Sequence, residues 1–264
     1  MDYLPIISCT LLIIIFTSTL FWVLDLIKRL YIKRGLTVGH ISTNPLLQPT
    51  KKHNRKQLEL KSLSGLSNSL KALLKINIII TAFATLIGLY DYYSYSNLSS
   101  GVDINEVWLL SDTATTIVVG VQFLIAIILG VTFLCWIYRA NKNLHFLSSE
   151  QMDFTPGWSI GWYFVPIANL FKPYQAMKEI WNVAHRGESS THTIIAWWWF
   201  LWITSTILDR MVMKLAIRAY DAAGHTAFTV AYVVSDGISV ALNVVALMLV
   251  TSIAQAYERN FVRR

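Results

Sequence analysis

The side chains best suited to chemistry in this sequence are polar or charged residues within its last two long apolar runs. They are Asp209, Arg210, Lys214, Asp236 and Asn243. Charges inside a membrane are costly, and those that are retained usually face a partner or a wet cavity on an ion or substrate path. We therefore predict that Asp236 pairs with Arg210 or Lys214 between two helices. The structural alternatives are a salt bridge with no further role, or a helix that ends early and leaves these charges among lipid headgroups.

Motifs for catalysis or metal binding do not accompany these charges. The sequence has no His-Glu-x-x-His motif, no phosphate-binding glycine loop and no paired cysteines. His145, His185 and His192 do not follow the spacing of a helical pair of metal ligands. We therefore expect a protein that is not an enzyme and that needs no metal and no cofactor.

Membrane-spanning helices would have to position these charges, and the composition favours such helices. Of the 264 residues, 55% are hydrophobic and 14% are charged, whereas soluble domains carry about 25% charged residues. A run of about 20 apolar residues can cross a bilayer as a helix. Runs of this kind cover about 6–27, 73–93, 114–138, 194–217 and 228–253. The sequence thus predicts an all-α, multi-pass membrane protein with five transmembrane helices.

The distribution of basic residues predicts how these helices are oriented, because lysine and arginine gather on the cytoplasmic side. With the N-terminus outside and the C-terminus inside, 19 of the 22 basic residues are cytoplasmic: eleven in 28–75, five in 139–193 and three at the C-terminus. The other three are Arg210, Lys214 and Arg218. This asymmetry accounts for the net charge of +7, so we expect no nucleic-acid partner.

The orientation divides the chain into four parts. They are an N-terminal transmembrane helix (1–27), a basic cytoplasmic linker (28–62), a membrane domain (63–256) and a cytoplasmic tail (257–264). The basic segments could bind anionic lipid headgroups.

Two amphipathic segments are predicted to lie along the inner membrane surface. The first covers 58–74, where leucines recur at helical spacing. The second covers 170–184, with Asn169 as its N-cap and Pro173 in its first turn. The segment 157–171 is apolar but too short to span, and its glycines and prolines give an irregular backbone that cannot face lipid tails. It either lies flat in the interface or re-enters the membrane.

Aromatic residues are concentrated between Pro156 and Trp202, which hold seven of the ten tryptophans. Tryptophan and tyrosine favour the headgroup level of a membrane. The candidate interface residues are Trp158, Trp162, Pro166, Asn169, Pro173, Tyr174, Trp181, Trp197, Trp198 and Trp199.

Three pieces of this region resemble a known family. They are WIYRANKNL at 136–144, the segment 156–181 with PIANLFKPYQAMKEIW at its end, and WWW at 197–199. They are similar to the bacterial membrane family catalogued as domain of unknown function 4328, and the resemblance covers about Leu63 to Ala256. It implies a multi-pass protein of four spans in the bacterial cytoplasmic membrane and supplies no activity, cofactor or catalytic residue. The helix at 6–27 lies outside the resemblance.

Two functions are compatible with these features. The first is a non-enzymatic membrane module that binds a protein partner, a second copy of itself, or lipid through its tryptophan-rich cytoplasmic interface. The second is a small transporter or channel component that uses Asp209, Arg210 and Asp236.

Overall fold

The computed structural model describes residues 50–96, 104–148, 152–187, 192–217 and 222–262. The chain divides into two compact units, Met1–His53 and Asn54–Arg264, and the description below concerns the second, together with the helix that leads into it. The predicted helix at 6–27, the predicted linker up to residue 49 and the end of the predicted tail lie outside the described residues.

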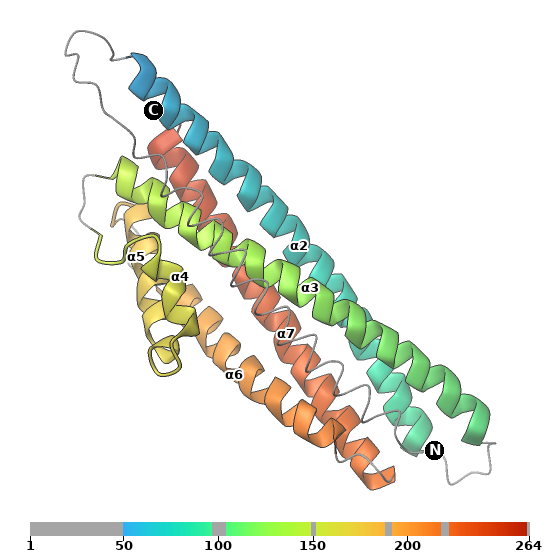
Figure 1. Ribbon diagram of the computed structural model, residues 1–264. Coiled ribbons are helices and arrows are strands. Elements are labelled where there is room, and N and C mark those ends of the chain that lie inside the picture. Colours follow the sequence, from blue (N-terminus) through green and yellow to red (C-terminus); the bar gives the residue numbers. More distant parts are fainter. Residues whose placement is uncertain (1–49, 97–103, 149–151, 188–191, 218–221, 263–264) are drawn as a thin grey trace, which may run out of the picture. The chain divides into compact units, whose positions relative to one another are not determined.

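All secondary structure in the described residues is helical, which confirms the all-α prediction (Figure 1). The α-helices are α2 (Thr50–Ser96), α3 (Ile104–Leu147), α4 (Trp158–Gly161), α5 (Lys172–Ala184), α6 (Thr193–Ala216) and α7 (Ala222–Tyr257). Two 3-10 turns, η2 (Trp162–Phe164) and η3 (Ala168–Leu170), lie between α4 and α5. A π-helical turn, η4 (Glu258–Val262), ends the described chain.

The four long helices α2, α3, α6 and α7 run side by side, and each is antiparallel to the next along the chain (Figure 1). One end of this bundle, called the packed end below, is where α2 begins, α3 ends, α6 begins and α7 ends. The short elements α4, η2, η3 and α5 lie at the packed end.

Among the described residues, three helices are long and apolar enough to cross a membrane. These candidate spans are Leu63–Tyr90, Ile117–Leu147 and Thr226–Val262. They contain the predicted span at 228–253 and most of the predicted spans at 73–93 and 114–138. Helix α6 coincides closely with the predicted span at 194–217, but it is not among these three.

Helix α2 is one continuous helix of 47 residues. The prediction of a separate surface helix at 58–74 is therefore wrong, and the predicted linker at 28–62 is helical from Thr50 onward. The sequence from Thr50 to Ser64 contains no glycine or proline, so nothing ends the helix there. The leucines that suggested a surface helix, Leu63, Leu70 and Leu74, are buried within the bundle instead.

Helices α2 and α7 approach each other closely at Gly88. A Cβ atom at this position would lie 2.8 Å from Cγ2 of Val233 and 3.4 Å from the Tyr232 ring. Glycine allows this approach because it has no side chain to separate the two backbones.

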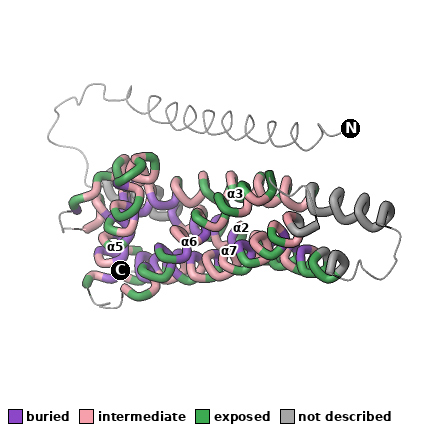
Figure 2. Tube along the Cα trace, turned by 90° about the horizontal axis from the view of Figure 1, so that it is seen from below, coloured by how far each residue is buried: buried purple, intermediate pink, exposed green. Residues whose placement is uncertain are grey.

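The main hydrophobic core lies at the packed end. Figure 2 shows a group of buried positions beside α5. The core combines residues of α3 (Trp136, Ile137, Leu144), α5 (Met177, Ile180, Trp181), α6 (Ile195, Trp198) and α7 (Leu249, Ile253, Tyr257). Buried side chains of α2 complete it, and Trp136 Nε1 donates a hydrogen bond of 2.8 Å to Ser67 Oγ of that helix.

Candidate functional site

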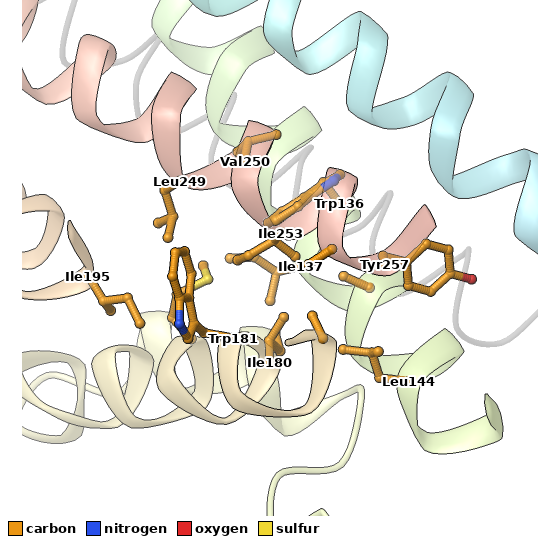
Figure 3. Close-up of a cluster of buried hydrophobic side chains, with 14 of the residues drawn as sticks. Trp136, Ile137, Leu144, Ile180, Trp181, Ile195, Leu249, Val250, Ile253 and Tyr257 are labelled. Atoms are coloured by element: carbon orange, nitrogen blue, oxygen red, sulfur yellow. The ribbon is translucent and has the colours of Figure 1, made fainter. Parts of the chain in front are cut away.

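Helix α5 directs its apolar face into the protein. Ile180 and Trp181 point from α5 toward Leu249 and Ile253 of α7 (Figure 3). The sequence predicted the helical periodicity of this segment correctly. It predicted that the helix lies along the membrane surface, but its apolar face contacts other helices of the protein. Gln175 and Lys178 on the opposite face are exposed.

The start of α5 differs in part from the prediction. The helix begins at Lys172, two residues later than predicted, and Pro173 lies in its first turn, as predicted. The predicted cap is wrong, because Phe171 takes the N-cap position without a side-chain hydrogen bond and Asn169 lies in η3. Asn169 Oδ1 is buried and accepts no hydrogen bond from the described residues.

The candidate interface residues fall into three groups by exposure. Pro173, Trp181, Trp198 and Trp199 are buried; Trp162, Asn169 and Tyr174 are partly buried; and Trp158, Pro166 and Trp197 are exposed. Trp158 is 53% exposed and Trp197 is 55% exposed. Three of these six tryptophans, Trp181, Trp198 and Trp199, therefore belong to the protein core, and two face outward.

The buried and partly buried tryptophans of α6 hold the irregular segment in place. Trp199 stacks on Trp202 with ring centroids 4.7 Å apart, and Trp199 Nε1 donates a 3.0 Å hydrogen bond to the carbonyl oxygen of Leu170. Tyr163 meets Trp202 edge-on at 6.2 Å. Burial raises the pKa of the Tyr163 phenol, so this side chain stays neutral. Both η2 and η3 are thus fixed against α6.

The outward face of this segment is apolar. Its exposed large residues are Trp158, Phe164, Ile167, Leu170 and Phe171, and together they are called the exposed apolar surface. Ile167 is the most exposed of them, at 76%. Beside them, Lys172 Nζ lies 5.5, 5.8 and 5.9 Å from the ring centroids of Phe154, Trp162 and Phe171. The surface therefore combines exposed apolar side chains with the Lys172 ammonium group, which is held among aromatic rings.

Glu179 holds the segment between α3 and α4 in place through hydrogen bonds. Its two carboxylate oxygens accept hydrogen bonds from the backbone N–H groups of Asp153 and Phe154, the latter at 3.2 Å. The Phe154 carbonyl oxygen in turn accepts a 3.0 Å bond from Asn141 Nδ2 and lies 2.9 Å from His145 Nε2. Burial raises the pKa of Glu179, and the two backbone donors partly oppose that effect.

The variant Glu179→Ala is expected to lose about 1–3 kcal/mol of unfolding free energy, because two backbone donors lose their acceptor. The raised pKa favours the protonated carboxyl in the folded state, so the contribution of Glu179 is largest at acidic pH and falls as the pH rises through the folded-state pKa. Unfolding in detergent at several pH values measures both effects. The control is Gln175→Ala, an exposed position on the same helix that should change stability by less than about 0.5 kcal/mol.

The polar residues of the last two helices are arranged differently from the prediction. Asp236 is buried and accepts hydrogen bonds from Gln122 Nε2 of α3 at 3.3 and 3.5 Å. Tyr232 donates a 3.0 Å bond to Gln122 Oε1, and Ser235 donates a 2.7 Å bond to Asp209 Oδ1.

The predicted pairing of Asp236 with Arg210 or Lys214 is wrong, since no ion pair joins them in the part of the chain that the structure describes. Arg210 and Lys214 are exposed on α6, whereas Asp236 is turned toward α3. Asn243 donates to the Ser239 carbonyl oxygen of its own helix at 2.7 Å. Gln122, the residue that sequence reasoning missed, was visible only as a polar interruption of the third apolar run.

The sequence also contains a Gly-x-Ser-x-Gly pattern at Gly157–Gly161. In hydrolases this pattern places an exposed serine on a sharp turn between a strand and a helix. Here Ser159 is fully buried within the short helix α4, and its hydroxyl donates a 2.8 Å bond to the Pro156 carbonyl oxygen. This geometry does not present a nucleophile.

No cluster of three or more histidine, cysteine or acidic residues suited to a metal ion occurs within the described ranges. His185 instead packs into the protein: its ring stacks on Trp181 with centroids 4.2 Å apart, and its Nε2 lies 3.3 Å from Ser252 Oγ of α7.

Comparison with known proteins identifies the family. The family described as domain of unknown function (DUF4328) matches residues 101–255, whereas the resemblance seen in the sequence was placed from about Leu63. No curated protein and no solved structure matches this chain. The matched residues cover more than half of the chain and include α3 to α6 and nearly all of α7, so the protein belongs to the DUF4328 family.

Proposed function

We propose that this protein spans a bacterial cytoplasmic membrane five times, with its N-terminus outside and its C-terminus inside. The distribution of basic residues supports this orientation. The antiparallel order of α2, α3, α6 and α7 agrees with four of the five spans. In this arrangement the packed end, with α4, η2, η3 and α5, lies at the cytoplasmic interface.

Binding, rather than catalysis, is the function that the site supports best. The protein acts as a membrane module that binds a protein or lipid component at the cytoplasmic interface through its exposed apolar surface. The observation that carries this proposal is the contrast within one segment: Trp158, Ile167 and Phe171 are exposed, although the backbone beneath them is fixed to α6 by buried aromatic contacts. Large apolar side chains exposed on a fixed backbone are typical of interaction sites.

A photoreactive amino acid at position 167 tests this function. The proposal predicts cross-links from this position to a defined protein or to lipid in intact membranes, because Ile167 is the most exposed residue of the surface. The same probe at Gln175, exposed on the polar face of α5, is the control and should give few cross-links. Equal labelling at both positions, or no cross-link at 167, would contradict the proposal.

A transporter or channel component is the second candidate. The observation that favours it is the buried Asp236 carboxylate, which Gln122 contacts from a neighbouring candidate span. Ion or solute flux in proteoliposomes that disappears with Asp209→Asn and with Asp236→Asn would support this function. Flux that is absent in the wild type, or unchanged in both variants, would exclude it.

A further inference from the structure

Lys172 occupies an unusual position for a lysine at the start of a helix. It follows Phe171 directly, is partly buried, and has three aromatic rings within 6 Å of its Nζ atom. Contacts of a cation with ring faces are favourable, and here they restrict a side chain that is otherwise highly flexible. The ammonium group is therefore held at one place, beside the exposed apolar surface, before any ligand arrives.

The residues that shortly precede Lys172 in the chain include three that are apolar and exposed. Ile167, Leu170 and Phe171 precede Lys172 within five positions and are all exposed. A partner that covers these side chains needs an apolar surface. A partner that also binds the Lys172 ammonium group needs a negatively charged group next to that apolar surface. A phospholipid joins both in one molecule.

The charge of the segment determines which phospholipids fit. Between Pro156 and Lys178 the sequence contains two lysines and no acidic residue. The nearest acid on α5, Glu179, is engaged with the backbone of Asp153 and Phe154. The segment is therefore complementary to a surface with net negative charge.

We propose that Lys172 and the exposed apolar surface form a docking site for anionic phospholipids, in which the Lys172 ammonium binds the lipid phosphate and Ile167, Leu170 and Phe171 contact the acyl region. This proposal rests on the proposed binding function and names its ligand. The site resembles interfacial lipid-binding elements in its chemistry, since apolar burial and electrostatic attraction act together. Its binding should therefore weaken as the salt concentration rises.

Competitive lipid retention tests the proposal. The full-length protein is purified in mild detergent with an equimolar mixture of phosphatidylglycerol and phosphatidylcholine, and native mass spectrometry counts each retained lipid. We expect the wild type to retain phosphatidylglycerol preferentially and K172Q to lower that preference about fivefold, which corresponds to about 1 kcal/mol for one basic residue at a membrane surface. K172R keeps the cation and should keep the preference.

The matched control is K178Q, which removes an exposed lysine of the same helix. It should change the preference by less than about twofold. If K172Q and K178Q lose the lipid preference equally, general surface charge explains the effect and the proposed site is overturned. The site is also overturned if K172Q keeps the wild-type preference. Melting temperatures measured in the same detergent confirm that the variants are folded, and K172R provides a folded comparison if K172Q is not.

The outcome separates this inference from the function on which it rests. Cross-links from position 167 to one protein only, with lipid retention insensitive to K172Q, would overturn the lipid site and leave the binding function standing. Cross-links to lipid together with a Lys172-dependent preference for the anionic lipid would support both.

Discussion

The variant Trp136→Ala is expected to unfold with about 3–5 kcal/mol less free energy than the wild type. Trp136 is 0% exposed and lies in the core at the packed end. Its removal leaves a large cavity in that core, and it deprives Ser67 of a 2.8 Å hydrogen bond from the indole N–H group. Reversible unfolding in mixed micelles, followed by circular dichroism, measures the difference.

Trp197→Ala is the matched control, because Trp197 is also a tryptophan on a long helix but is 55% exposed. Its loss should change the unfolding free energy by less than about 1 kcal/mol, since it leaves no buried cavity. A similar loss for both variants would show that the core does not lie where the structure places it.

Ile180→Ala is expected to lower the unfolding free energy by about 2–5 kcal/mol. Ile180 is completely buried between α5 and the ends of α3 and α7. An alternative would place the apolar face of α5 in lipid, as an amphipathic surface helix. In that case the bundle would unfold with unchanged free energy, because the protein would have lost no internal contact.

Ile167→Ala is the control for this comparison, since it makes the same chemical change at a position that is 76% exposed. Its unfolding free energy should stay within about 0.5 kcal/mol of the wild type in detergent. If Ile180→Ala were as mild as Ile167→Ala, the packing of α5 against α7 would be refuted.

Helix positions could be predicted from the sequence, whereas helix lengths could not. Hydropathy identifies the part of a helix that suits a membrane, and it located α6 to within one residue at each end. It does not show how far a helix continues into polar sequence. Helices α2 and α3 extend beyond the predicted spans because no glycine or proline ends them at the membrane boundary.

The sequence could not show what the apolar face of an amphipathic helix packs against. The same apolar stripe suits a lipid surface or a protein core, so periodicity alone could not show that Trp181 is buried while Trp158 is exposed. The partner of Asp236 was missed for a related reason. Charge suggested Arg210 or Lys214, but packing brings the neutral Gln122 into contact instead.

The central claim is that the exposed apolar surface enters the membrane interface. Spin labels test this claim most directly. A single cysteine is introduced at Ile167 or at Gln175 in a variant whose native Cys9 and Cys135 are replaced by alanine. In bilayers of phosphatidylglycerol and phosphatidylcholine, we predict that the label at 167 collides readily with oxygen and is shielded from a water-soluble nickel complex, whereas the label at 175 shows the reverse. A label at 167 as accessible to nickel as the one at 175 would contradict the account.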